Sequence, residues 1–490
     1  MKKTTIISFL VLLTIGVSSD GGRKFYRIYH ETYLAEINFD KVNKGSIALS
    51  PDKRHIAFVQ KNNGGYSVVL DSKVFPSYPA IENNFIYFSP DSRHIAYITR
   101  KKNGSFSVIY DEKEIDSYDN ISKYGLVFSP DSQSLAYAAL KGKSWLVIKN
   151  GEVMASLENV GGLSPFFSPD SQKLAFVGLN GGKWFVSVDG VKYEHENIMG
   201  IDSGAFYFTK DSRNFFYLIQ REGKWLSVYN GKEGEGKDDI DPRTIAFGEN
   251  DKVAYLALNG RDKETAVWYL ILEKSGKSLP LSLSFMDKEK VEIGQNKYDI
   301  LGRPVFSADG KILSYAVREE GQWKMVVGGE KSSGYLLLTN PVFHDKTNAC
   351  AYGAVVGEKK YFVVLNGKEG KNYESISFPE FVFSRDGSRY AYPAMEDGKW
   401  IIASDQGEYG KKYDGIVPGA MSFIFNNKIV FVAEIQKKQS VVIETTEGPF
   451  YDYIFLGGNF KTVEDNTHQF HYLGAKGKNI YLVEEEIRYR

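Results

Sequence analysis

The chain of 490 residues has 61 basic and 61 acidic side chains, and 42% of its residues are hydrophobic. These values indicate a folded globular protein. Because the charges balance, the chain lacks the surplus of basic residues that binding to nucleic acid requires, and we expect no nucleic-acid partner. The length allows several domains or one array of repeats. The single cysteine, Cys350, excludes an intrachain disulfide.

The N-terminus has the pattern of a signal peptide. Lys2 and Lys3 precede an apolar run at residues 6–17, and the small residues Val17 and Ser19 stand where a signal peptidase requires them. The run is short for a membrane-spanning helix, although a retained anchor or a buried strand would show a similar pattern. We expect residues 1–19 to be cleaved and the protein to be exported in a bacterium, to the periplasm or the exterior, with no stable membrane span afterwards.

One ten-residue segment recurs along the chain. The segment FSPDSRHIAY at residues 88–97 has close copies that begin at Phe128 and Phe167, and looser copies that begin at Phe208, Phe306 and Phe383. Alternating apolar residues flank a turn in which Pro90 fixes φ and the Asp91 side chain can bond nearby amides. We therefore predict a β-hairpin, and we interpret the recurring Asp as a turn residue in preference to a catalytic or metal-binding carboxylate.

Two further segments complete each repeat. A third strand begins with an aromatic residue, and the six tryptophans stand at this place: Trp145, Trp184, Trp225, Trp268, Trp323 and Trp400. We expect these rings to pack between neighbouring sheets. A fourth segment reads aromatic, acid, any residue, aliphatic, as at residues 118–121. The turn residues Asp52, Asp91 and Asp131 are 39 and 40 positions apart, and a period near 40 with four strands is typical of a β-propeller blade.

The repeated segment resembles the WD-like repeat of TolB-type proteins and of the propeller in prolyl-oligopeptidase-family peptidases. The resemblance covers residues 45–475 and implies a β-propeller, a fold that serves binding platforms, sensors and enzymes alike. The sequence has no Gly-x-Ser-x-Gly motif. We therefore do not expect the hydrolase domain of the peptidases. Because the repeats begin almost at once, we also do not expect the N-terminal α/β domain of TolB-type proteins.

The spacing gives about eleven four-stranded repeats, more than the four to eight blades of a typical propeller. Residues 25–42 look like the third and fourth strands of an incomplete blade, which the unit at residues 245–260 would complete. We predict an all-β fold with two consecutive propellers of about six and five blades, at residues 20–260 and 261–490. The alternative is one large or open ring.

The acid of the fourth segment recurs once per repeat, at Asp40, Asp119, Glu158, Glu196, Asp299, Glu374, Asp414 and Asp452. In a propeller this segment crosses one face, so we predict that these carboxylates share that face and attract a basic protein or peptide partner. Alternatively, each acid solvates the end of its strand or bonds the next turn.

No catalytic residue, cofactor site or metal site is predicted. The histidines have no metal-ligand spacing: His30, His55, His94, His195, His344, His468 and His471. We expect an exported, non-catalytic platform that binds a protein or a component of the cell envelope. The alternative function is an enzyme or small-ligand sensor with its site in the central channel.

Overall fold

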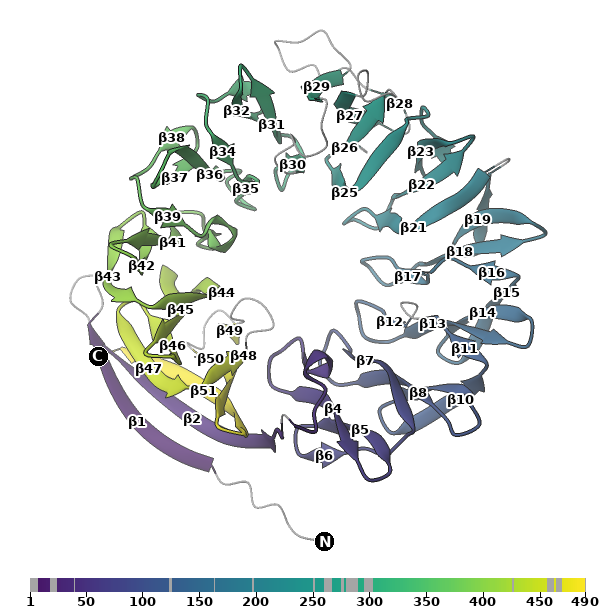
Figure 1. The fold of residues 1–490 in the computed structure, drawn as a ribbon, viewed down its shortest axis with the longest axis horizontal. Helices are drawn as coiled ribbons and strands as arrows, with labels where there is room; N and C mark the ends of the chain where they lie inside the picture. Colours follow the sequence, from purple (N-terminus) through teal and green to yellow (C-terminus); the bar gives the residue numbers. More distant parts are fainter. Residues whose placement is uncertain are drawn as a thin grey trace. The chain divides into compact units, whose positions relative to one another are not determined.

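The computed structural model shows an all-β protein built from eleven antiparallel sheets (Figure 1). It describes residues 8–17, 24–38, 40–122, 126–162, 164–195, 198–249, 252–259, 267–274, 277–278, 290–294, 303–424, 427–455, 462–463 and 469–489. In the described ranges, two short 3-10 helices, Lys44–Ser46 and Phe378–Glu380, interrupt the strands. Among the described residues, no helix has the length and apolar character needed to cross a membrane. The predicted all-β propeller with eleven four-stranded repeats is confirmed.

The chain forms two compact units, and the first contains residues 1–121 and 379–490. Four of its sheets follow the repeat, with the strands β3 (Ala48–Leu49), β4 (Ile56–Asn62), β5 (Gly65–Leu70), β6 (Lys73–Val74); β7 (Ala80–Phe88), β8 (Ile95–Arg100), β9 (Phe106–Tyr110), β10 (Lys113–Tyr118); β40 (Val382–Phe383), β41 (Tyr390–Glu396), β42 (Lys399–Ser404), β43 (Gly407–Tyr413); and β44 (Gly415–Ile424), β45 (Lys428–Ile435), β46 (Lys438–Ile443), β47 (Thr446–Tyr451). The short strand β11 (Asn120–Ile121) ends the first segment of this unit.

The second unit contains residues 122–378. Its six sheets have the strands β12 (Val127–Phe128), β13 (Leu135–Lys141), β14 (Ser144–Lys149), β15 (Glu152–Leu157); β16 (Asn159–Val160), β17 (Phe166–Phe167), β18 (Leu174–Asn180), β19 (Lys183–Val188), β20 (Val191–Glu194); β21 (Ile198–Phe208), β22 (Phe215–Arg221), β23 (Lys224–Tyr229), β24 (Lys232–Glu233); β25 (Asp239–Phe247), β26 (Lys252–Asn259), β27 (Val267–Lys274), β28 (Lys277–Ser278), β29 (Lys290–Gly294); β30 (Val305–Phe306), β31 (Leu313–Glu319), β32 (Gln322–Val327), β33 (Glu330–Lys331); and β34 (Leu337–Leu338), β35 (Val342–Phe343), β36 (Cys350–Gly357), β37 (Lys360–Leu365), β38 (Lys368–Glu369). The strand β39 (Ser375–Ile376) follows them.

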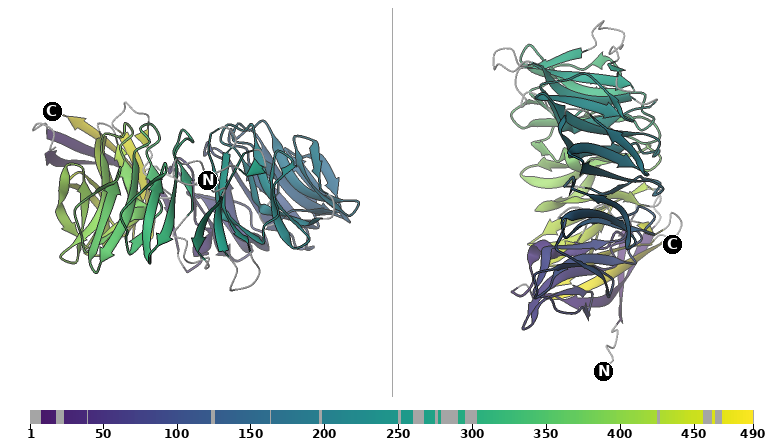
Figure 2. Two further views of the ribbon diagram at one scale, coloured as in Figure 1. Left: turned by 90° about the horizontal axis from the view of Figure 1, so that it is seen from above. Right: turned by 90° about the vertical axis from the view of Figure 1, so that its right-hand side faces the viewer.

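The fifth sheet of the first unit contains both ends of the chain, and we call it the terminal sheet. Its strands are β1 (Ser8–Val17), β2 (Lys24–Glu36), β48 (Tyr453–Phe455), β49 (Thr462–Val463), β50 (Gln469–Lys476) and β51 (Asn479–Tyr489). Figure 2 shows β2 and β51 as long neighbouring strands, and they pair antiparallel from Phe25–Tyr489 to Glu36–Asn479. Residues 8–17, predicted to lie within a cleaved signal peptide, pair with β2; their cleavage stays a prediction.

The partner of β2 differs from the one predicted. The unit at residues 245–260 forms its own sheet, in which β25, β26, β27 and β28 are all present, and β2 completes the C-terminal strands instead. The predicted boundary after residue 260 lies between β26 and β27, which pair with each other from Lys252–Lys274 to Asn259–Val267. Alternation within a strand defines its buried face but does not select which distant strand it pairs with. The arrangement as two rings or one stays a prediction.

The recurring segment forms the predicted hairpin. In FSPDSRHIAY, β7 ends at Phe88 and β8 begins at Ile95, and these two residues pair. In the copy at residues 128–137, Asp131 Oδ1 accepts hydrogen bonds from Ser129 Oγ at 2.6 Å and from the Gln133 amide at 3.0 Å. The interpretation of the repeated Asp as a turn residue is therefore confirmed.

The turn also connects consecutive sheets. Its fourth residue has a positive φ, 65° at Ser132 and 66° at Ser171. The Asp131 amide donates to Ser171 Oγ of the next turn at 2.9 Å, and the same 2.9 Å bond joins Asp52 to Ser92. Each hydroxyl thus binds the preceding turn, which explains a serine at a backbone position that usually favours glycine or asparagine.

The hydrophobic core lies between consecutive sheets of a unit. One cluster joins Val147 of β14 to Phe176 and Phe185 of the following sheet. Trp145, Trp184 and Trp225 each pack, partly buried, against a cluster shared by two neighbouring sheets. These three rings lie between sheets as predicted, and they fill the space between units with large apolar surfaces.

Candidate functional site

Three of the acids predicted to form an acidic face bond a turn of the following sheet. Glu158, Asp414 and Asp452 each lie at the connection between one sheet and the next. Their carboxylates accept from backbone amides of the turn between the second and third strands: Gly181 for Glu158 (3.1 Å), Gln436 for Asp414 (2.8 Å) and Gly477 for Asp452 (2.7 Å). This geometry is the one expected if the acid serves to bond the next turn.

Lysines accompany two of these acids. Lys399 Nζ lies 2.6 Å from Asp414 Oδ1, and Lys438 Nζ lies 2.6 Å from Asp452 Oδ1. The Lys399 ammonium and the Gln436 amide lower the pKa of Asp414. The ion pairs reduce the net negative charge that these two carboxylates present to a partner.

The other five predicted acids differ in exposure, and two of them are not described. Asp40 and Asp119 are exposed and Glu374 is half-buried, whereas Glu196 and Asp299 lie outside the described residues. The shared docking face for a basic partner stays a prediction.

Two histidines after the turn form a repeated structural contact. His55 Nδ1 lies 2.8 Å from Asp71 Oδ2, and His94 Nδ1 lies 2.9 Å from Asp111 Oδ2. The hydrogen bond that the His55 ring donates to the Asp71 carboxylate raises the pKa of His55. Both rings are partly exposed, as expected for hairpin residues, and each holds the turn that ends the third strand.

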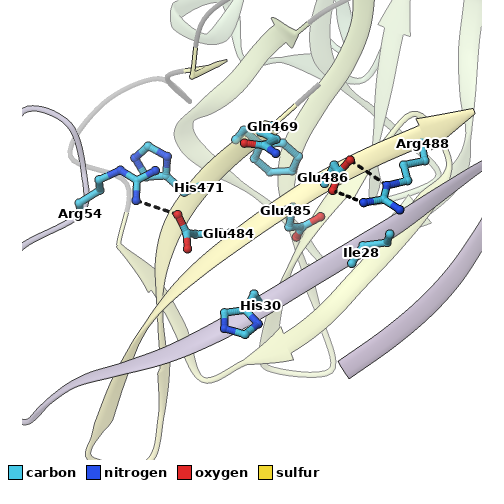
Figure 3. A pocket seen from close by; sticks show the side chains of 10 residues that line it. Ile28, His30, Arg54, Gln469, His471, Glu484, Glu485, Glu486 and Arg488 are labelled. Carbon is cyan, nitrogen blue, oxygen red and sulfur yellow. Dashed lines mark hydrogen bonds and ion pairs between the residues drawn. The ribbon is translucent and has the colours of Figure 1, made fainter. Parts of the chain in front are cut away.

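A pocket of about 320 Å³ opens on the terminal sheet (Figure 3). Its polar lining comes from β2, β50, β51 and the turn before β4, through His30, Arg54, His471, Glu484, Glu486 and Arg488. We call it the terminal-sheet pocket. His30 and Arg54 are far in the sequence from the other four side chains, and the pairing of both chain ends brings the two groups together.

The pairing of β2, β51 and β50 places the side chains that line the pocket in rows across these strands. Glu484 of β51 is directly opposite His30 of β2 on one side and His471 of β50 on the other. Glu486 has the same position between Ile28 and Gln469. Directly opposed residues extend from the same face of a sheet, so His30, Glu484 and His471 form one row across three strands.

His471 presents a buried acceptor in this pocket. It is 6% exposed, and its Nε2 contacts the main-chain carbonyl of Asp52. A carbonyl oxygen only accepts, so Nε2–H donates and Nδ1 keeps its lone pair. Burial lowers the pKa of His471, and the nearby Arg54 charge acts in the same direction. Nδ1 has no hydrogen-bond partner among the residues that the structure describes, which is uncommon for a buried polar atom.

Charges of both signs surround this acceptor. Arg54 Nη1 lies 2.7 Å from Glu484 Oε1, and Arg488 Nε lies 2.8 Å from Glu486 Oε1 (Figure 3). Both pairs are partly exposed, and such pairs exchange partners at little cost. The pocket can therefore offer a carboxylate to an incoming cation.

A buried ion pair fixes the strands beneath the pocket. Arg27 Nη2 lies 2.7 Å from Glu485 Oε2, and both side chains are 0% exposed. Tyr472 Oη donates to Glu485 Oε1 at 2.8 Å, and Arg27 Nη1 donates to the Val441 carbonyl at 3.0 Å. Burial raises the pKa of Tyr472 well above its ordinary value. This network holds β2, β50 and β51 in register.

Sequence reasoning did not find this site. The sequence pattern shows His30 and His471 only as histidines without metal-ligand spacing, and it does not predict a role for the run Glu484–Glu486. Their signal was the run of charged residues in the otherwise apolar last strand, NIYLVEEEIRY. No group of three His, Cys, Asp or Glu in the described part of the chain is arranged to hold a metal ion.

Comparisons with known proteins concern the fold alone. No family model and no curated protein matches the chain. Among solved structures, one titled "Crystal structure of the eukaryotic initiation factor" has 11% identity and a TM-score of 0.39, over 74% of this chain and 96% of that chain. TolB from Acinetobacter baumannii has 14% identity and a TM-score of 0.25, over 66% of this chain and 78% of that chain.

A structure from work on two prolyl endopeptidases has 12% identity and a TM-score of 0.31, over 74% of this chain and 54% of that chain. Both groups of proteins that the repeats resemble are therefore among the structures similar to this one. With its eleven four-stranded blades, the chain is a β-propeller repeat protein.

Proposed function

We propose that this protein is an exported, non-catalytic β-propeller that binds a protein partner at the terminal-sheet pocket. The observation that carries the proposal is the buried Nδ1 of His471, an acceptor without a donor among the described residues. Leaving a buried polar atom unbonded costs roughly 1–3 kcal/mol, and a donor supplied by a partner removes this cost. Glu484 lies in the same row, so the donor that fits best is a cationic side chain.

The export part of the proposal rests on the sequence. Lys2, Lys3 and the apolar run at residues 6–17 have the order of a signal peptide. Cell fractionation, with the mass of the N-terminal peptide of the purified protein, tests it. We expect a protein outside the cytoplasm that begins near Asp20. A cytoplasmic protein that still begins at Met1 would contradict export.

A capture experiment tests binding. The full-length chain, a His30→Ala/Glu484→Gln pocket variant and a control Lys411→Gln variant are incubated with envelope extract. Lys411 pairs with Glu447 at 2.8 Å on β43 and β47, and neither residue lines the pocket. We expect a partner that binds the wild type and the control variant and is lost from the pocket variant.

The same three proteins test the non-catalytic assignment. They are assayed with panels of peptide, ester and glycoside substrates. We expect no turnover from any of them. Turnover by the wild type that the pocket variant loses would replace the binding proposal by an enzyme.

A further inference from the structure

The terminal sheet has an outer edge unlike those of the other sheets. In the other ten sheets, the described outer strands contain two to seven residues. In the terminal sheet, the outermost strand β1 contains ten residues, and the strand β2 with which it pairs contains 13 residues. Short outer strands protect a sheet from pairing with other chains, whereas a long edge presents a row of unpaired amides and carbonyls.

In the full-length chain this edge is covered by residues 8–17. They pair antiparallel with β2 in nine registered pairs, from Ser8–Thr32 to Val17–Lys24. These residues are the apolar part of the predicted signal peptide. Their removal on export would leave the outer edge of β2 without its partner strand.

We propose that β2 is a docking edge, to which a partner protein adds an extended, mainly apolar segment as an antiparallel strand with a basic residue opposite His30. This proposal rests on the proposed function and gives its binding mode. The segment 8–17 shows the geometry of the bound strand, since it is an extended apolar segment already paired with this edge. In strand addition, main-chain hydrogen bonds supply affinity and side-chain pockets supply specificity.

The register explains the basic residue. Leu10 is paired with His30, and His30 begins the row that continues through Glu484 to His471. Adjacent strands lie about 4.8 Å apart, so Glu484 is about two strand spacings from the docked residue. A lysine or arginine at that position extends over His30 toward Glu484. The terminal-sheet pocket would thereby bind one side chain of the docked strand and select for its charge.

The test uses the full-length chain with Leu10→Pro and Leu12→Pro. Proline has no amide donor and disfavours strand pairing, so β1 should leave the edge while the rest of the chain is unchanged. The probe is a synthetic peptide of residues 8–17 with Leu10 replaced by Lys. Hydrogen exchange of β2 amides and the dissociation constant are measured together.

We expect exchange in β2 to rise in the proline variant and to fall again when the peptide is added. A peptide with Glu in place of that Lys should bind at least about tenfold more weakly, as expected when a charge-assisted contact is replaced by repulsion. A Glu484→Gln substitution in the proline variant should remove this preference and retain binding. A peptide with Pro in place of Leu12 is the control and should not bind.

Three results would overturn the docking edge. The first is unchanged exchange of β2 when the peptide is added, and the second is protection of a different strand. The third is a doubled mass of the proline variant without peptide, because β2 would then pair with a second copy. A cytoplasmic location or failed capture from extract would overturn the proposed function without changing these peptide results.

Discussion

Arg27 and Glu485 are 458 positions apart in the chain, yet they form a bidentate ion pair that is fully buried between β2 and β51. The guanidinium also donates to the carbonyls of Val441 and Thr446. Every polar contact of this arginine therefore depends on the C-terminal strands. The pair connects the two ends of the chain within one sheet.

Replacing Arg27 by Met should destabilise the protein by about 3–5 kcal/mol, because Glu485 would remain buried without its cation. The double variant Arg27→Met/Glu485→Met should recover most of this loss, since both charges are removed. Denaturant unfolding measures both. The control is Arg54→Met, which breaks a partly exposed pair and should cost less than about 1 kcal/mol. An Arg27→Met protein as stable as the wild type would contradict the role of the pair.

A second prediction concerns the serine that joins consecutive turns. Ser171→Ala removes the acceptor of the Asp131 amide, whereas the β-carbon at a φ of 66° is common to serine and alanine. We expect a loss of about 1 kcal/mol from the hydrogen bond. Ser171→Asn should be nearly neutral, because Asn348 and Asn427 also have a positive φ and donate to the aspartate of the preceding turn. Equal stability of the Ala and Asn variants in thermal unfolding would contradict a stabilising bond between consecutive turns.

A third prediction concerns acid. Hydroxyl and amide donors lower the pKa of the turn residues Asp131, Asp170 and Asp211. A folded pKa below the unfolded value of about 3.9 stabilises the protein fully above that value, and this contribution disappears as the pH falls through the folded pKa. Replacing the three residues by Asn should therefore make Tm fall less as the pH is lowered from about 5. The difference between variant and wild type should develop below about pH 4. Parallel Tm–pH curves of variant and wild type would contradict the assignment.

Cys350 gives a fourth prediction. It lies in the core of its sheet at 4% exposure, and burial raises the pKa of its thiol to about 12. The thiolate is the reactive form, so the folded protein should not react with a thiol reagent near neutral pH. After unfolding in denaturant, one thiol per chain should react. Rapid labelling of the folded protein would show that this part of the second unit opens readily.

A fragment of residues 20–260 tests the predicted division of the chain. The fragment includes β2 but not β51, so Arg27 would lose Glu485. We expect it to lack a cooperative thermal transition because an unpaired buried charge is strongly destabilising. A cooperative melt would instead support two consecutive propellers divided at residue 260.

Much of the local architecture follows from the sequence alone. The recurring SPDS turn specifies a hairpin because Pro sets φ and Asp bonds the adjacent amides, and the structure has this geometry at Asp131. The period near 40 specifies four-stranded blades, and eleven sheets are present. These features depend on residues close together in the chain, so local chemistry is sufficient to determine them.

Only the tertiary structure determines the strand with which β2 pairs and the place of the pocket. The alternating pattern of β2 is compatible with several distant partners, and β51 is selected through contacts such as Arg27–Glu485. The row of His30, Glu484 and His471 exists only because that pairing has one register. Chain separations of several hundred residues leave no local pattern that specifies such a row, since only the packed sheets define which side chains meet.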